Sequence, residues 1–174
     1  EYGKADWLTV ITDDKRIFAA VKVFDGNALM TKKAHMTGTD RVAEAASILN
    51  LADGDIVVNI QGDQPCIGYQ HIEQVVALLQ ADPRLPVSTL AYKIRHEEEI
   101  DSSNAVKVVF DKDFYALYFS RWPIPYRRNG EGPPYYKHLG IYAYRRSFLR
   151  KYAKMVPGKL EKAESLEQLR VIEN

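Results

Sequence analysis

An apolar run followed at once by a polar turn constrains this 174-residue chain more than any other feature. Residues 55–60 read Asp-Ile-Val-Val-Asn-Ile, which has the length and the β-branched content of a buried strand. The next residues read Gln61-Gly-Asp-Gln-Pro65, so Asp63 follows the carboxyl end of that strand. Ligands of open α/β sheets bind at this edge. Asp63 is therefore a candidate metal ligand, with a helix cap or a turn residue as the alternative.

Strand-like and helix-like segments alternate through the first half of the chain. The apolar patterns predict strands at 7–12, 28–31, 55–60 and 86–92. They predict a helix with Ile17, Ala20 and Val21 on its apolar face, and further helices at 40–49 and 69–80. This β-α-β alternation with short loops predicts an α/β fold with a Rossmann-like, doubly wound and mostly parallel sheet.

The pattern changes after residue 95. We expect a hairpin of strands 106–110 and 116–119, an irregular segment at 122–136 with four prolines and two glycines, and a strand at 138–144. Helices are expected at 146–152 and at 165–173. The chain is predicted to form one domain over 1–174, with a main part at 1–95 and a small α+β lobe at 96–174.

Composition and charge exclude several classes of partner. The formal net charge of +1 gives no reason to expect nucleic acid or an acidic membrane as a partner. A single cysteine excludes an internal disulfide framework and fits a reducing compartment. There is no apolar run of membrane-span length. We therefore expect a cytoplasmic protein without membrane insertion.

Four further segments give the Gln61–Pro65 turn its context. They are Met36-Thr-Gly-Thr-Asp-Arg-Val-Ala-Glu-Ala45, Ser103-Asn-Ala-Val-Lys-Val-Val109, Phe119-Ser-Arg121 and His138-Leu-Gly-Ile-Tyr-Ala-Tyr144. In order and spacing, from about Trp7 to Arg170, the chain resembles the sugar-acid cytidylyltransferases. It is most similar to those that activate 3-deoxy-manno-octulosonate (KDO) for lipopolysaccharide biosynthesis.

The resemblance implies a reaction and its partners. CTP and a KDO-like sugar acid would give a CMP-sugar and pyrophosphate, with Mg²⁺ as the cofactor held by Asp63. Residues 1–95 would then bind the nucleotide, and residues 96–174 would form a sugar-binding lid that also builds a homodimer. Such a phosphoryl transfer needs positioning and cations more than a nucleophilic side chain.

The segment before the helix at 40–49 is the candidate nucleotide site. A helix amino terminus offers free N–H groups to an anion or a base edge. By resemblance, the cytosine and ribose are contacted by Thr37, Gly38, Thr39 and Arg41. From the residues alone, we expect Thr39 or Asp40 to be the N-cap and Glu44 to pair with Arg41 on the helix surface.

Two arginines are candidates for a clamp on the sugar carboxylate, because the guanidinium fork matches a carboxylate. By resemblance these are Arg121 and Arg128, and the sugar hydroxyls are bound by Gln61, His138, Tyr142, Glu167 and Gln168. A solvated surface charge is the alternative for each arginine, and a buried structural histidine is the alternative for His138. Lys107 is predicted near phosphate or metal-bound water, with an outward-facing lysine on a lid strand as its alternative.

Two family segments have no counterpart in the 174 residues: an opening loop of the kind Pro-Ala-Arg-x-x-Ser-x-Arg-x-x-x-Lys and a late Val-Asp-Thr-Pro-Glu-Asp. We therefore expect the chain to correspond to the middle of an enzyme and to lack turnover by itself. The alternatives are another CMP-sugar synthetase, of the sialate or amino-KDO type, and a non-catalytic module that binds a sugar acid or dimerises.

Overall fold

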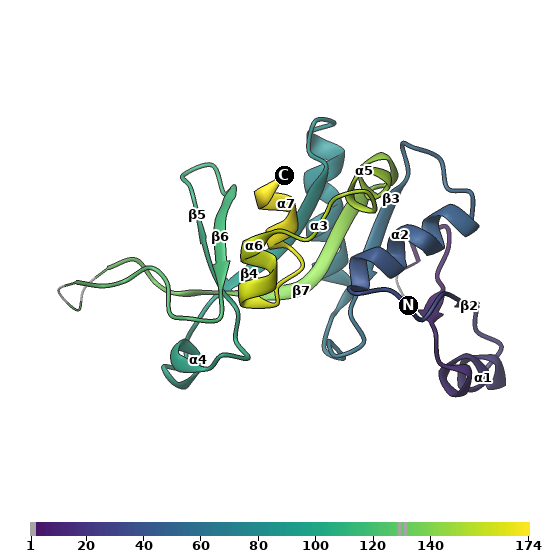
Figure 1. Cartoon of the computed structure of the whole chain (residues 1–174), viewed down its shortest axis with the longest axis horizontal. Coiled ribbons are helices and arrows are strands. Elements are labelled where there is room, and N and C mark those ends of the chain that lie inside the picture. The colour runs from purple at the N-terminus through teal and green to yellow at the C-terminus, as the bar shows by residue number, and fades with distance from the viewer. Residues whose placement is uncertain (1–2, 129, 131) are drawn as a thin grey trace. The chain divides into compact units, whose positions relative to one another are not determined.

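The computed structural model describes residues 3–128, 130 and 132–174 and has a mixed α/β architecture (Figure 1). The strands are β1 (Val10–Thr12), β2 (Ala28–Met30), β3 (Ile56–Ile60), β4 (Val87–Lys93), β5 (Lys107–Phe110), β6 (Ala116–Ser120) and β7 (Tyr136–Arg145). The helices are α1 (Lys15–Val23), α2 (Gly38–Ile48), α3 (Tyr69–Ala81), α4 (Glu98–Asp101), α5 (Arg146–Tyr152), α6 (Lys159–Glu164) and α7 (Leu169–Glu173). The predicted α/β class is confirmed.

In the described residues the strands form two sheets, a parallel pair and a larger sheet that contains antiparallel pairs. β1 and β2 pair in parallel, with Val10 opposite Ala28. The larger sheet has the hydrogen-bonded order β3-β7-β5-β6, and β4 also pairs with β7. Within it β5 runs antiparallel to both β6 and β7. The antiparallel strands follow from the hairpin that the sequence predicts after residue 95.

The chain divides into two compact units. Unit 1 comprises residues 1–88 and 142–154, and unit 2 comprises residues 89–141 and 155–174. Both units are therefore discontinuous in sequence, because the end of β7 and helix α5 return to unit 1 between the two segments of unit 2. The functional division at residue 95 is a prediction that this division by contacts does not test.

In unit 1, apolar helix faces build the core. Val42, Ala43 and Ala46 of α2 are buried, and α2 packs against α5, whose Leu149 is fully buried. Helix α3 packs against β3 and buries Val75. Helix α1 follows its predicted pattern less well: Val21 is buried, but Ile17 is 49% exposed. The apolar face expected for α1 is therefore only partly buried in the part of the chain that the structure describes.

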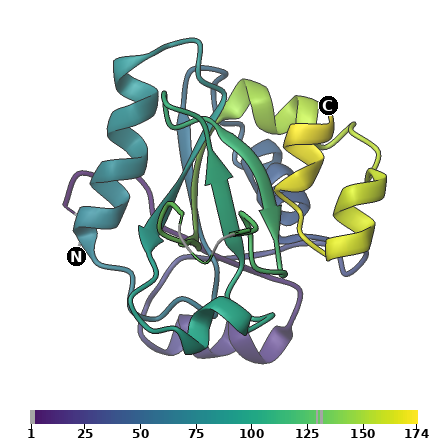
Figure 2. The ribbon, with the colours of Figure 1, turned by 90° about the vertical axis from the view of Figure 1, so that its left-hand side faces the viewer.

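Unit 2 is built on the β5–β6 hairpin. The Asp111 side chain closes the hairpin turn by accepting hydrogen bonds from the main-chain N–H groups of Asp113 and Tyr115 (2.9 Å each). Figure 2 shows α6 and α7 side by side next to β6. The apolar cluster of this unit consists of Val108, Phe119, Leu166 and Leu169.

The helix predicted at 165–173 is wrong in its bounds. Within this range the structure has only the short helix α7, from Leu169 to Glu173, and Ser165 caps the preceding helix α6 in the left-handed conformation (φ 52°). Behind this break, Arg170 donates to both carboxylate oxygens of Glu161 (2.8 and 2.6 Å) in a buried ion pair. Helices α4 and α6 were not predicted.

The irregular segment at 122–136 carries no helix or strand before β7 in its described residues. Residues 129 and 131, which belong to this predicted segment, lie outside the described residues. Across residues 3–128, 130 and 132–174, none of the helices has both the length and the apolar character that a membrane span needs.

Candidate functional site

The predicted metal ligand lies on a tight turn at the end of β3. The Gln64 N–H donates to the Gln61 carbonyl (3.0 Å), which closes the turn and leaves Asp63 exposed. The Asp63 carboxylate accepts one long contact from Gln64 Nε2 (3.5 Å) and forms no ion pair with any described residue. An exposed, unpaired carboxylate fits a Mg²⁺ ligand, since Mg²⁺ often takes only one or two protein carboxylates. Among the described residues there is no group of three or more metal-binding side chains.

The amino terminus of α2 is capped by Thr37. Its hydroxyl accepts from the Asp40 N–H (3.2 Å) and donates to Asp40 Oδ2 (2.8 Å). The expectation that Thr39 or Asp40 is the N-cap is therefore wrong by two or three positions. The cap falls earlier because Gly38 already has helical geometry.

Thr39 and Arg41 are both engaged within unit 1. Thr39 is fully buried, and its hydroxyl lies 2.9 Å from that of Tyr144. Arg41 donates to the Thr31 hydroxyl (2.6 Å) and pairs with Asp13 (3.2 Å). The structure thus directs both side chains toward protein groups, and their contacts with a nucleotide stay a prediction.

The expected pair of Arg41 and Glu44 is also wrong. Glu44 instead lies 2.5 Å from His35 Nε2 and accepts from the Lys32 N–H (3.0 Å). These contacts hold the loop before α2 against the helix. The pKa of Glu44 is lowered, mainly by its hydrogen bond with His35.

Two predicted sugar-binding residues belong to unit 1. Gln61 is half-buried on the turn after β3. Tyr142 is buried in β7, where its ring stacks on that of Tyr144 (centroids 5.6 Å apart). Unit 1 therefore carries seven predicted site residues, which are Thr37, Gly38, Thr39, Arg41, Gln61, Asp63 and Tyr142.

Arg121 lies at the end of β6 in unit 2 and is tied to main-chain carbonyls. Its guanidinium donates to the carbonyls of Glu164 (2.8 Å), Ser103 (2.9 Å) and Ser165 (3.3 Å). The alternative of a solvated surface charge is therefore wrong for this half-buried residue. One N–H on each terminal nitrogen remains for a ligand carboxylate.

Lys107 is fully buried in β5. Its ammonium donates to the carbonyls of Arg121 (2.6 Å) and Ser102 (2.8 Å). Desolvation lowers the pKa of this lysine. The alternative of an outward-facing lysine is wrong, and these contacts favour a structural role; a part in phosphate chemistry stays a prediction.

His138 is buried on β7 with its ring against Phe119 (centroids 5.0 Å apart). Its Nε2 lies 2.8 Å from the Thr89 hydroxyl. Burial lowers the pKa of His138 from 6.5 to about 4, so the ring is neutral at pH 7. These contacts agree with the alternative of a structural histidine and leave a sugar contact as a prediction.

The remaining candidates differ in exposure. Arg128 is exposed and makes no ion pair with a described residue. Glu167 is half-buried and Gln168 is buried, both on the turn between α6 and α7. Unit 2 thus carries six predicted site residues, which are Lys107, Arg121, Arg128, His138, Glu167 and Gln168.

Sequence reasoning missed Glu164. Its carboxylate accepts from the Arg121 N–H (2.9 Å) and from the Ser120 hydroxyl (2.7 Å). A glutamate in a lysine-rich and glutamate-rich stretch looks like a surface residue, so no local signal reveals these long-range contacts.

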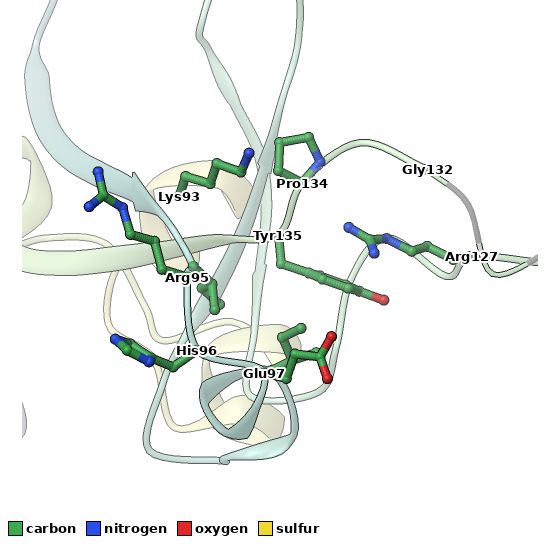
Figure 3. A pocket seen from close by; sticks show the side chains of 10 residues that line it. Lys93, Arg95, His96, Glu97, Arg127, Gly132, Pro134 and Tyr135 are labelled. Carbon is green, nitrogen blue, oxygen red and sulfur yellow. The ribbon is translucent and has the colours of Figure 1, made fainter.

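Unit 2 also contains a cavity of about 340 Å³, lined by parts of residues 93–100 and 127–135 (Figure 3). Arg127 lies 4.2 Å above the ring of Tyr135 on one side of it, and Glu97 lies among its lining residues. None of the predicted site residues lines this cavity. It is therefore separate from the predicted sugar-binding residues.

Comparison with known proteins gives a consistent result. A model of the cytidylyltransferase family matches residues 2–174. The chain is 56% identical over 168 residues to the 3-deoxy-manno-octulosonate cytidylyltransferase of Syntrophus aciditrophicus strain SB, covering 96% of this chain and 68% of the relative. It is 48% identical over 168 residues to the 8-amino-3,8-dideoxy-manno-octulosonate cytidylyltransferase of Shewanella sp. strain ANA-3, covering 96% and 69%.

A solved structure is also similar. It is that of a CMP:2-keto-3-deoxy-manno-octonic acid synthetase complexed with CTP, with a TM-score of 0.89 and 43% identity. The match covers 98% of this chain and 69% of that one. On these grounds the chain belongs to the cytidylyltransferase family.

Proposed function

We propose that this chain belongs to an enzyme that transfers the cytidylyl group of CTP to 3-deoxy-manno-octulosonate. The products are CMP-KDO, for lipopolysaccharide biosynthesis, and pyrophosphate. The observation that carries this proposal is the 56% identity to a relative with that name, over 96% of the chain. The similar solved structure is a complex with CTP, which supports CTP as the nucleotide substrate.

In this reaction the anomeric hydroxyl oxygen of the sugar attacks the α-phosphorus of CTP. A new O–P bond forms while the bond to the bridging oxygen of the β-phosphate breaks, and the hydroxyl proton is lost. Unit 1 would contribute the amino terminus of α2, where the helix dipole favours an anion or a base edge. Unit 2 would contribute Arg121, which is held in one orientation by carbonyl contacts and keeps N–H donors for a carboxylate.

We propose Asp63 as the carboxylate that holds Mg²⁺. Its exposure, its lack of an ion pair among the described residues and its position after β3 support this role. The bound metal would neutralise phosphate charge as it develops. The chain's own contribution is the turn closed by Gln61 and Gln64, which presents the carboxylate to solvent.

One other sugar acid is a specific alternative to KDO as the substrate. Relatives named for 8-amino-3,8-dideoxy-manno-octulosonate are 48% identical to this chain, close behind those named for KDO. The two sugars differ in the group at carbon 8, where an amine replaces a hydroxyl. KDO remains our first assignment because the relatives of higher identity carry that name.

We further propose a cytoplasmic homodimer. Unit 2 exposes large apolar side chains on its hairpin and on the segment that follows, including Phe114 (81%), Trp122 (78%) and Tyr126 (87%). Apolar surface of this kind favours association with a second copy. The exposed free thiol of Cys66 fits a reducing compartment. Light scattering during gel filtration would reveal a monomer if the dimer proposal is wrong.

The activity is best tested in a chimera in which this chain replaces the matching 168 residues of the Syntrophus aciditrophicus relative. With CTP and Mg²⁺, we expect pyrophosphate release with KDO and little with 8-amino-KDO or N-acetylneuraminate. Preference for the amino sugar would move the assignment to the second group of relatives. Absence of release with every acid, from a folded chimera, would contradict the proposed function.

A further inference from the structure

The Glu164 carboxylate in unit 2 gathers three donors from β6 and its end. It accepts from the Arg121 N–H (2.9 Å), the Ser120 hydroxyl (2.7 Å) and, more weakly, the Tyr118 hydroxyl (3.4 Å). Burial raises the pKa of Glu164, but the hydrogen bonds from Arg121 and Ser120 outweigh it, so the net pKa is lowered. The carboxylate is therefore ionised at neutral pH and bound to the main chain of the predicted clamp residue.

Arg121 returns this contact with its side chain. Its Nε donates to the Glu164 carbonyl (2.8 Å), and its terminal nitrogens donate to Ser165 (3.3 Å) and Ser103 (2.9 Å). Each of the two residues thus binds the main chain of the other with its own charged side chain. Charge-assisted hydrogen bonds of this kind are stronger than neutral ones.

A second charged side chain, that of Lys107, holds the main-chain carbonyl of Arg121. The Lys107 ammonium donates to the Arg121 carbonyl (2.6 Å) and to the Ser102 carbonyl (2.8 Å), and the lysine is fully buried. The N–H and the C=O of Arg121 are therefore both held by ionic side chains from other elements. These two contacts fix the main chain of Arg121 and therefore the direction in which its side chain points from the end of β6.

The same contacts reach the turn that carries the predicted hydroxyl-binding residues. Glu164 is the last residue of α6, and Glu167 and Gln168 follow three and four positions later, before α7. The left-handed Ser165 reverses the chain at this point. Any movement of Glu164 is therefore transmitted along a short, bent piece of chain to Glu167 and Gln168.

We propose that Glu164 is a positioning residue for the sugar acid, setting the orientation of Arg121 relative to Glu167 and Gln168. This inference rests on the proposed function, since it takes Arg121 as the clamp on the sugar carboxylate. Glu164 does not touch the substrate; it acts through the residues on either side of it. Its removal would loosen the sugar site while the nucleotide residues in unit 1 keep their contacts.

The test compares two matched variants of the chimera. Glu164→Gln keeps the volume but replaces one accepting oxygen with an NH₂ group, which cannot accept from Arg121 or Ser120. Glu173→Gln is the control, because Glu173 also ties α6 to α7, by accepting from the N–H groups of Leu160 (2.9 Å) and Glu161 (3.1 Å), but has no contact with Arg121. Arg121→Lys serves as the reference for a damaged clamp.

We expect Glu164→Gln to raise the KM for the sugar acid about tenfold, as the loss of a charged hydrogen bond predicts, with the KM for CTP within about twofold. Glu164→Asp, which keeps the charge, should recover part of that loss. Glu173→Gln should leave both constants unchanged. Equal changes in the two KM values, or an unchanged sugar KM in Glu164→Gln, would overturn the proposal.

Hydrogen exchange separates this inference from the proposed function. In Glu164→Gln, exchange should accelerate in peptides covering 102–104, 119–122 and 164–168 together, whereas in Glu173→Gln it should accelerate only around 159–161. Acceleration confined to 119–122 would show that Glu164 does not hold the turn. If the unmodified chimera transferred cytidylyl to no acid, the proposed function would fail, and the exchange pattern would still decide whether Glu164 links these segments.

Discussion

Thr89 fixes the tautomer of His138. The Thr89 hydroxyl donates to the Ile141 carbonyl (2.7 Å), so its oxygen accepts from His138 Nε2–H at 2.8 Å. The neutral ring with its proton on Nε2 satisfies this arrangement, and burial disfavours a second proton. A predicted sugar contact is thereby held in one protonation state across the neutral pH range.

This arrangement predicts a pH dependence of stability. The folded-state pKa of His138 is about 4, below its ordinary value of 6.5. As the pH falls, His138 is therefore protonated in the unfolded chain before it is protonated in the folded one. The contribution of His138 to the free energy of unfolding is fully present above pH 6.5 and decreases by about 3 kcal/mol as the pH falls toward 4. Urea unfolding of the chain at pH 7.5, 5.5 and 4.5 measures this loss.

Carboxylates titrate in the same range, so the histidine needs a matched variant. His138→Gln keeps an N–H donor near Thr89 and does not titrate. Its free energy of unfolding should decrease less steeply between pH 6.5 and 4 than that of the original chain. Parallel curves for the two proteins would show that His138 is not the group responsible.

The contact between Thr39 and Tyr144 predicts that the two side chains are energetically coupled in the protein without bound nucleotide. Both hydroxyls are buried, with their oxygens 2.9 Å apart. In a double-mutant cycle of Thr39→Val and Tyr144→Phe, we expect a coupling energy of about 1 kcal/mol in the free energy of unfolding. Zero coupling, accompanied by a raised KM for CTP in Thr39→Val alone, would instead make Thr39 a nucleotide contact.

Asp63→Asn should reduce turnover of the chimera roughly a thousandfold, because the amide keeps the shape but loses the charge that holds Mg²⁺. The midpoint of thermal unfolding should stay unchanged, since the carboxylate is exposed and has no ion pair among the described residues. Asp6→Asn, another exposed aspartate, is the control. Normal turnover of Asp63→Asn at low Mg²⁺ would remove Asp63 from the metal site.

Lys107→Met separates a structural lysine from a catalytic one. Removing the ammonium leaves the carbonyls of Ser102 and Arg121 without their buried donor, so the free energy of unfolding should decrease by about 2–4 kcal/mol. Urea denaturation measures this effect. If the variant kept its stability and lost only turnover, a catalytic role of Lys107 near the phosphates would be favoured instead.

Local patterns predicted the regular elements well and their interruptions poorly. Helix α5 has its predicted bounds, Arg146–Tyr152, and α3 begins at the predicted Tyr69, because apolar periodicity determines both. The break at Ser165 was missed because the buried Glu161–Arg170 pair favours it, and that pair joins residues of two helices. The N-cap at Thr37 was missed because several consecutive residues in that segment can cap a helix.

The same distinction applies to the candidate site. The position of Asp63 on an exposed turn follows from the strand that precedes it, and the structure agrees with that placement. The burial of Lys107 could not be predicted, because its carbonyl partners lie 5 and 14 residues away and on different segments. A lysine in a strand has no local pattern that distinguishes a buried ammonium from a solvated one.

The discontinuity of unit 1 has a consequence for biosynthesis. Thr39 meets Tyr144 across 105 residues, and α2 packs against α5. On the ribosome, α2 is complete long before α5 emerges, and all of residues 89–141 are made in between. The side of α2 that packs against α5 therefore stays uncovered in the nascent chain through that interval, and closing so long a loop is slow. Chaperone binding and aggregation are expected to be greatest at that stage, when the first half of the chain waits for a helix that has not yet been translated.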